Sequence, residues 1–230
     1  MIVYGRNAVR EALRGPREVG SVWATERAAR EPWLGGMEVS RARVEELERR
    51  CRSDAHQGIV AEVSRYRYVD AVDLLDGPEP LIVALDRVQD PQNLGAIARG
   101  AECAGATGLV LPRHGSAEVT PAVCRASAGA VEHMAIARVR NLADFLADAK
   151  ASGCWCYGTV AGADLDYRSP DYRGGVVCVF GSEARGLRPR VAAACDALIA
   201  VPMRGRIESL NVATAVAVVL YGILQRRDAT

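Results

Sequence analysis

The sequence has few of the features that would assign it to a special class of protein. Only 5% of its residues are aromatic, Lys150 is its only lysine, and its formal net charge is +1. Its seven cysteines include no C-x-x-C pair. The longest apolar run, near residues 212–224, is shorter than the about 20 residues that cross a bilayer. These absences argue against a zinc-ribbon protein, a membrane protein, and a protein that attracts nucleic acid through its overall charge.

The two cysteines that lie closest together also argue against a metal site. Cys154 and Cys156 alternate with Trp155 and Tyr157 in an expected strand. Side chains two residues apart on a strand point to the same face, so we interpret both thiols as packed core groups. Unpaired cysteine is typical of a reducing cytoplasm, and charges close to Met1 argue against a signal peptide. The sequence therefore predicts a cytoplasmic protein that binds no metal.

The pattern of apolar residues predicts two α/β domains. In residues 1–65 we expect a helix near residues 6–14, strands at 19–24 and 58–63, and a surface helix over 40–51 with Val44 and Leu47 on its inner face. Residues 66–80 end in Gly-Pro-Glu-Pro and predict a linker. From residue 81 to 230, strands and helices alternate as in a mostly parallel sheet with helices on both faces.

The most informative segment lies where a buried strand gives way to an apolar helix. The strand is expected at residues 197–201, and the helix runs from residue 212 to 224. Asn211 has the chemistry of an N-cap for that helix, and Ser209 lies two residues before it. In open α/β sheets such strand-to-helix corners bind ligands. A core helix with an ordinary N-cap would explain Asn211, but it would not explain the polar residues that precede Asn211.

Two other strand ends carry polar residues of the same kind. A strand near residues 81–85 leads through a polar turn into a helix with Asn93 and Arg99. A strand at 176–180 leads into a loop with Glu183 between Gly181 and Gly186, and these glycines permit tight turns and close approach to a ligand. Each segment by itself is a weak indication of a site, but the three together are a strong one.

In this order, the three segments resemble the motifs of the SpoU (TrmH) family of RNA 2′-O-ribose methyltransferases, part of the SPOUT superfamily. Asn93-x-Gly95-x-x-x-Arg99 is similar to motif 1, residues 181–187 to motif 2, and residues 202–212 to motif 3. Near the N-terminus, Tyr4-Gly-Arg-Asn-Ala-Val and His56-Gln-Gly-Ile-Val-Ala resemble the small RNA-binding domain of the RlmB-like branch. The resemblance covers the chain except the linker.

The resemblance implies a fold and a reaction. The fold is a trefoil-knotted SPOUT domain with a mostly parallel sheet, preceded by a small L30e-like α/β domain, and the protein is expected to form a homodimer. The reaction is transfer of a methyl group from S-adenosylmethionine to a guanosine ribose of large-subunit (23S) ribosomal RNA. The residues implied as catalytic are Arg99, Asn93, Glu183, Ser209 and Asn211. Those implied as cofactor-binding are Thr159, Gly181, Val201 and Leu210.

The N-terminal domain is interpreted as the part that recognises the RNA. Arginine suits this role at a low net charge, because its planar guanidinium binds phosphate and stacks on bases. A GC-rich genome would equally account for much of the arginine content. The candidate RNA-binding residues are Arg6, Asn7, Arg10, His56 and Gln57.

Two other functions remain open at this stage. The same chemistry can act on transfer RNA or on another rRNA nucleotide, including an antibiotic-resistance site. A catalytically silent RNA-binding assembly factor would keep the fold, although the intact motif residues argue against it. A nicotinamide-dependent oxidoreductase is disfavoured because no G-x-G-x-x-G follows the strand at residues 81–85.

Overall fold

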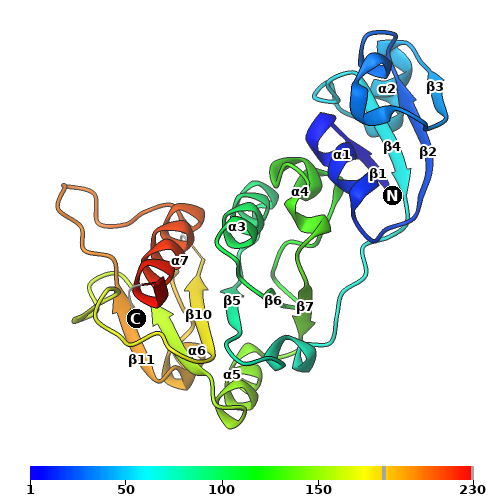
Figure 1. Ribbon diagram of the computed structural model, residues 1–230. Helices are drawn as coiled ribbons and strands as arrows, with labels where there is room; N and C mark the ends of the chain where they lie inside the picture. The colour runs from blue at the N-terminus through cyan, green and yellow to red at the C-terminus, as the bar shows by residue number, and fades with distance from the viewer. Residues whose placement is uncertain (183–184, 229–230) are drawn as a thin grey trace.

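The computed structural model describes residues 1–182 and 185–228, which form two α/β units joined by an extended connector (Figure 1). The first unit contains a four-stranded sheet of order β1-β4-β2-β3, in which only the β2–β3 pair is parallel. Its elements are β1 (Ile2–Tyr4), α1 (Arg6–Arg14), β2 (Val19–Ala24), the 3-10 helices η1 (Ala28–Arg30) and η2 (Pro32–Leu34), β3 (Val39–Arg41), α2 (Val44–Cys51) and β4 (Ile59–Val63).

The surface helix of this unit differs from the one expected. The prediction that it begins at residue 40 is wrong, because residues 39–41 form β3, where Ser40 pairs with Trp23 of β2. The helix begins at Val44, and Leu47 is fully buried as predicted. Val44 itself is 45% exposed, so its assignment to the inner face is also wrong. The short strand takes up residues that were expected to form the first turn of the helix.

The second unit is built on a seven-stranded sheet of order β7-β6-β5-β10-β8-β11-β9, in which every pair of neighbouring strands is parallel. Its strands are β5 (Leu81–Asp86), β6 (Gly108–Pro112), β7 (Ile136–Val139), β8 (Trp155–Thr159), β9 (Leu165–Asp166), β10 (Val176–Gly181) and β11 (Ala197–Ala200). Its helices are α3 (Pro91–Cys103), α4 (Pro121–Ala126), η4 (Ala130–Glu132), α5 (Leu142–Ala151), α6 (Pro189–Ala194) and α7 (Val212–Asp228).

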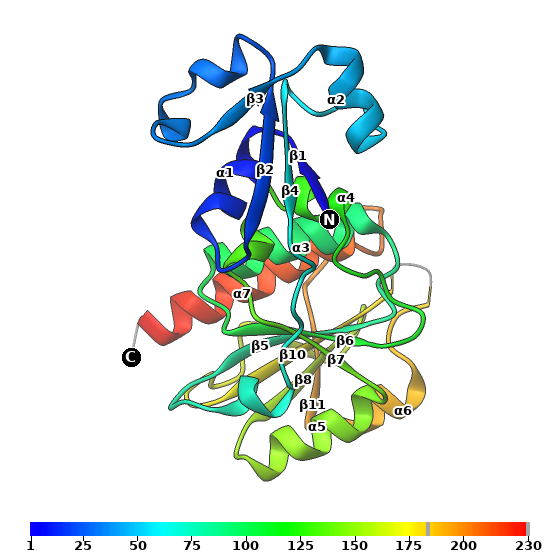
Figure 2. The same cartoon turned by 90° about the vertical axis from the view of Figure 1, so that its right-hand side faces the viewer.

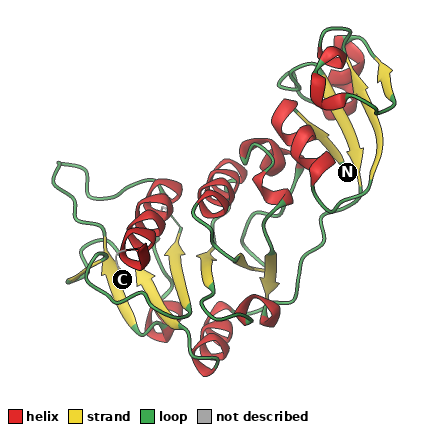
Figure 3. Ribbon diagram, viewed as in Figure 1, coloured by secondary structure: helices red, strands yellow, loops and turns green. Residues whose placement is uncertain are grey.

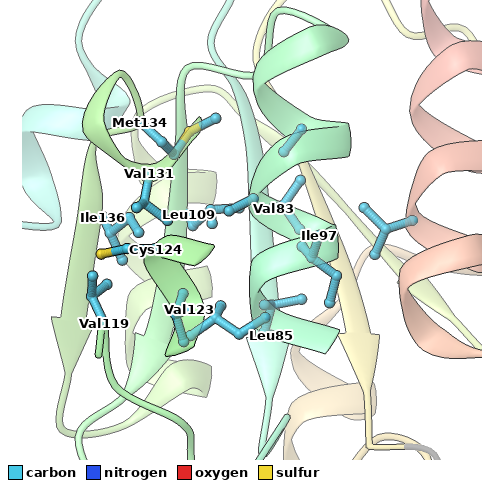
Figure 4. Packing of buried hydrophobic residues seen from close by; sticks show 14 of the residues in the cluster. Val83, Leu85, Ile97, Leu109, Val119, Val123, Cys124, Val131, Met134 and Ile136 are labelled. Atoms are coloured by element: carbon cyan, nitrogen blue, oxygen red, sulfur yellow. The ribbon is translucent and has the colours of Figure 1, made fainter. Parts of the chain in front are cut away.

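Helices cover both faces of this sheet (Figure 3). In Figure 2, α3, α4 and α7 lie between the sheet and the N-terminal unit, whereas α5 and α6 lie on the opposite face. The strands read as continuous apolar runs because both of their faces are buried. Successive residues of β5 alternate between the two sides: Val83 packs towards α3, and Ile82 towards α5. Figure 4 shows the first of these cores, with Val83 and Leu85 of β5 facing Ile97 of α3.

The connector between the two units packs against the second one. The backbone N–H of Val69 donates to Ile136 O at 3.0 Å, and Val69 forms a parallel bridge with Ala137 of the edge strand β7. A 3-10 helix, η3 (Val72–Leu75), follows and buries Leu74 and Leu75 against the α5 side of the sheet. Residues 66–80 therefore hold the N-terminal unit at a defined position, while the exact domain boundaries stay a prediction.

A buried ion pair joins the two units directly. Arg17, which follows α1, pairs with Glu132 of η4, and Nε of Arg17 donates to Glu132 Oε2 at 2.7 Å. Only 5% of the Arg17 side chain and none of the Glu132 side chain is exposed. Burial by itself would lower the pKa of Arg17, but the hydrogen bonds and charge of Glu132 raise it, so the guanidinium stays charged. The hydroxyl of Tyr66 donates to Met134 O beside this pair.

The cysteines are packed as single thiols. All seven are free, and Cys154 and Cys156 are buried, which confirms their interpretation as core groups. Burial raises the pKa of Cys156 and of Cys178 to about 12, which keeps both thiols protonated at neutral pH. Within residues 1–182 and 185–228, no cluster of three or more side chains has the make-up of a metal site. None of the helices described is both long and apolar enough to span a bilayer.

Replacing Arg17 by alanine is expected to lower the free energy of unfolding by about 3–5 kcal/mol, because it leaves the Glu132 carboxylate buried without its partner. Urea denaturation of the whole chain measures this. The matched control is Arg190→Ala, which removes a solvent-exposed ion pair with Asp144 and should cost less than about 1 kcal/mol. Equal effects of the two changes would contradict the assignment of the Arg17 pair as an anchor between the units.

Candidate active site at the carboxyl edge of the sheet

The three motifs meet at one edge of the seven-stranded sheet. Strands β5, β10, β8 and β11 are neighbours and parallel, so their carboxyl ends lie side by side. The chain extends the sheet to one side of β5 through β6 and β7, then crosses through α5 to β8 on the other side, and β10 later takes the place between β5 and β8. Ligands of open parallel sheets bind at such a reversal of strand order.

Motif 1 forms the first turns of α3. Asp90 caps this helix by accepting a hydrogen bond from Gln92 N at 3.0 Å, and Pro91 occupies the first position of the helix. Asn93 therefore lies at the helix start, beside the end of β5. Gly95 is required for packing, because a Cβ there would lie 2.4 Å from Ala126 Cβ of α4. The glycine of motif 1 thus lets α4 approach α3 closely.

Motif 3 is attached to motif 1 by a side-chain hydrogen bond. Asn211 Nδ2 donates to Asn93 Oδ1 at 3.0 Å, although 118 residues separate the two. Asn211 Oδ1 accepts from Ala213 N at 2.9 Å and Thr214 N at 3.3 Å, so its predicted role as N-cap of the last helix is confirmed. A single amide side chain therefore caps α7 and fixes α7 to the start of α3.

Motif 2 folds back over the end of β10. A Cβ on Gly181 would lie 2.1 Å from the carbonyl carbon of Gly186, so no larger residue fits there. Gly186 has a φ of +64° and closes the loop by donating its N–H to Ser182 O at 2.8 Å. Glu183, expected to be catalytic, lies outside the described residues.

One organising contact of the site was not expected from the sequence. Asp86, the last residue of β5, is 1% exposed and accepts two hydrogen bonds from Arg188, one from its backbone N at 2.9 Å and one from Nε at 2.8 Å. Arg188 directly follows motif 2 and precedes α6. The ion pair therefore holds the motif 2 loop against the end of β5. The available signal was a single acidic residue at the end of an otherwise apolar strand.

The four residues expected to bind the cofactor line one pocket. Thr159, Gly181, Val201 and Leu210 come from the ends of three strands and from the motif 3 loop. Ser209 lines the same pocket. These residues fit S-adenosylmethionine, since glycine permits close backbone approach and the apolar walls suit an adenine ring. Thr159 Oγ1 is buried without a hydrogen-bond partner in the described part of the chain, so it offers a polar group for a ligand to satisfy.

Arg99 lies apart from these residues. It is exposed on α3, six residues after Asn93, which corresponds to a rise of about 9 Å along the helix. It does not line the pocket that contains Thr159, nor the smaller hollow formed by Asn93, Arg87 and Ser182. Its side chain is therefore exposed to solvent and forms no wall of either hollow.

The candidate RNA-binding residues divide into two groups. His56 is only 4% exposed, and its Nδ1 accepts from Gly58 N at 2.9 Å, so the expectation of a loop histidine available to RNA is wrong. Its ring instead stabilises the turn. Gln57 is exposed with a φ of +54°, and its Oε1 accepts from Arg6 N at 2.9 Å at the start of α1.

The other three candidates belong to α1. Asn7 is exposed, Arg6 pairs with Glu31 at 2.8 Å, and Arg10 Nε donates to Glu11 Oε1 at 2.9 Å. The structure thus brings Arg6, Asn7 and Gln57 together where α1 begins. Contact of any of them with RNA stays a prediction.

Comparison with known proteins agrees with this architecture. The SpoU rRNA Methylase family model matches residues 80–221, and the model for the RNA 2′-O ribose methyltransferase substrate-binding domain matches residues 2–69. The 23S rRNA (guanosine-2′-O-)-methyltransferase RlmB of Pseudomonas putida is 36% identical over 240 residues, covering 98% of this chain and 96% of that protein.

Two solved structures have the same fold. The AdoMet-bound rRNA methyltransferase from Sinorhizobium meliloti superposes with a TM-score of 0.82 at 31% identity, covering 100% of this chain and 87% of that one. The SpoU methyltransferase AviRb from Streptomyces viridochromogenes, in complex with AdoMet, gives a TM-score of 0.82 at 25% identity, covering 100% and 91%. The expected α/β methyltransferase fold behind a small substrate-binding domain is thereby confirmed, while the knot stays a prediction.

These matches run through both units and include each of the three motifs that meet at the carboxyl edge of the sheet. The chain therefore belongs to the SpoU (TrmH) family of RNA 2′-O-ribose methyltransferases.

Proposed function

We propose that this protein methylates the 2′-hydroxyl of a guanosine ribose in 23S ribosomal RNA, with S-adenosylmethionine as methyl donor. The observation that carries the proposal is the joining of motifs 1 and 3 by Asn93 and Asn211 beside the pocket lined by Thr159, Gly181 and Leu210. The identity of 36% with an RlmB enzyme over nearly the whole chain supports the choice of RNA and of nucleotide. We place the protein in the cytoplasm, with the ribosomal RNA it modifies.

S-adenosylmethionine, when bound, supplies a methyl group already activated on a sulfonium. The protein then has to position the ribose oxygen and help it lose its proton. Thr159 and the backbone around Gly181 hold the cofactor, and Asn93 and Ser209 orient the ribose beside it. Arg99 carries only hydrogen-bond donors, and its position outside the pocket suits it to bind the phosphate next to the target ribose. The proton passes to a phosphate oxygen, to Glu183 or to water.

We further propose that the protein acts as a homodimer. The whole of residues 202–211 is exposed, and this segment carries three large apolar side chains, with Ile207 76% exposed and Met203 and Leu210 each 37% exposed. In Figure 1 it extends away from the body of the second unit. The segment also lines the cofactor pocket through Glu208 and Ser209. A second copy of the chain that covers these apolar groups would order the pocket at the same time.

The first test follows labelled methyl transfer from S-adenosylmethionine to unmodified large-subunit rRNA and maps the product by resistance of the ribose linkage to alkali. We expect label at one guanosine for the wild type and a loss of at least about a hundredfold in rate for Arg99→Ala, with cofactor binding retained. Cys103→Ser, an exposed change on the same helix, is the matched control and should retain activity.

Label on transfer RNA but not on rRNA would contradict the proposed substrate. Cofactor binding without transfer to either RNA would favour a silent assembly factor.

Thr159→Val tests the cofactor site, because it should weaken cofactor binding without lowering the free energy of unfolding. Valine has the same shape but removes a buried hydroxyl that has no partner in the described chain, so the free energy of unfolding should stay constant or rise slightly. S-adenosylmethionine should bind about fivefold more weakly by calorimetry, the cost of about one neutral hydrogen bond. Thr107→Val is the matched control: its hydroxyl donates to Leu81 O at 3.1 Å, so this change should lower stability and leave cofactor binding unaltered. Unchanged affinity in the Thr159 variant would remove this residue from the site.

Light scattering after size exclusion tests the dimer. The wild type is expected to elute with the mass of two chains at micromolar concentration, and Ile207→Asp is expected to shift it towards the monomer by placing a charge in the apolar contact. Leu165→Asp, at a large apolar side chain of the sheet edge with lower exposure, provides the control and should leave the dimer intact. A wild type that stays monomeric would overturn the proposal.

A further inference from the structure

Arg125, a residue outside the three motifs, bridges the two units at the point where α1 begins. It lies on α4 of the methyltransferase unit, and its Nε donates to Ala55 O of the N-terminal unit at 2.9 Å. A Cβ built on Gly5 would lie 3.8 Å from Arg125 Cγ and 3.3 Å from Gln57 Oε1. Arg125 is therefore packed against the turn that presents Gln57 and against the start of α1.

The turn that Arg125 holds is itself tightly ordered. Gln57 has a φ of +54° and Gly58 one of +81°, both in the left-handed region. His56 Nδ1 accepts from Gly58 N inside the turn, and Gln57 Oε1 accepts from Arg6 N outside it. A non-glycine residue is kept in this conformation only where surrounding contacts enforce it. The turn is thus a rigid platform that displays exposed Gln57 next to Ala55, whose carbonyl binds Arg125.

Short contacts connect this platform to the catalytic helix. Ala126, the neighbour of Arg125, lies against Gly95 of motif 1, so closely that a Cβ on Gly95 would meet Ala126 Cβ at 2.4 Å. Arg99 follows Gly95 by four residues and lies on the same side of α3, one turn further along. Arg125 is therefore linked through Ala126 and Gly95 to the helix that carries Arg99, and through Ala55 to the turn beside the start of α1.

The charge of Arg125 remains available for a ligand. Its Nε is used by Ala55 O, whereas its two terminal nitrogens donate no hydrogen bond to residues 1–182 or 185–228. No carboxylate in the described part of the chain forms an ion pair with it. Neighbouring arginines differ: Arg6 and Arg10 are each paired with a glutamate. A guanidinium held by one nitrogen and open at the other two is suited to a phosphate.

We propose that Arg125 is a positioning and RNA-contact residue with two roles. Nε fixes the N-terminal turn at a set distance from Arg99, and the two terminal nitrogens bind a phosphate of the RNA strand between the part recognised by the N-terminal unit and the methylated ribose. The inference rests on the proposed function, since it needs RNA as the substrate. It adds a contact from the methyltransferase unit to those expected from the N-terminal unit.

Arg125→Gln separates the two roles. The Nε2 of glutamine occupies the position of the arginine Nε, so the bond to Ala55 O can be kept while the charge and the terminal nitrogens are lost. Binding of a fluorescein-labelled RNA hairpin, followed by anisotropy over a range of salt concentrations, is the readout. We expect Arg125→Gln to weaken binding about tenfold and to reduce the slope of log K against log salt by about one, with thermal stability and cofactor affinity unchanged. Arg125→Lys should restore the slope.

Arg227→Gln is the matched control. Arg227 lies near the end of α7, and its Nε also donates to a backbone carbonyl, Tyr172 O at 3.0 Å, in the loop that precedes β10 at the amino edge of the sheet. Its replacement should lower stability and leave RNA binding as in the wild type.

An unchanged salt slope for Arg125→Gln would overturn the inference, with or without a loss of stability. The binding assay needs no methyl transfer, so RNA binding without methylation by the wild type would count against the proposed function alone.

Discussion

The hydrogen bond between Asn93 and Asn211 is the contact on which the rest of the site depends. It joins the N-terminal ends of α3 and α7, two helices that follow different strands of the sheet. Because Asn211 also caps α7, the same side chain sets where the helix begins and where motif 3 meets motif 1. The pocket beside it is then closed by the motif 2 loop, which the Asp86–Arg188 ion pair holds against β5.

A second constraint concerns the position of the N-terminal unit. The Arg17–Glu132 pair is buried where the two units meet, and the apolar cluster continues from Val9 and Ala12 of α1 to Val123 and Val131 of the second unit. A substrate-binding domain attached in this way cannot swing freely on its connector. An enzyme of this family has to select one ribose in a large RNA. A fixed distance between the substrate-binding domain and the methylation site helps it to do so, because only a ribose at that distance from the bound RNA segment can react.

The distribution of paired arginines explains how a chain with a net charge of only +1 can bind RNA. Many arginines on its surface are neutralised locally, for example Arg168 by Asp166 and Arg173 by Asp171, both through contacts two residues away. Arg99 and Arg125 have no acidic partner in the described chain. Local patches of this kind attract phosphate where the overall charge does not.

The sequence by itself determined the parallel sheet, the positions of most elements and the three motifs. Continuous apolar runs ending in polar turns leave few alternatives, and Asn211 was recognisable as a cap from its neighbours alone. The structure decided what depends on distant residues: β3 in place of the first turn of a helix, the burial of His56, the Asp86–Arg188 pair and the separation of Arg99 from the pocket. Local propensity and periodicity depend on near neighbours, whereas these features arise from contacts between residues as many as about a hundred positions apart, which only the folded chain brings together.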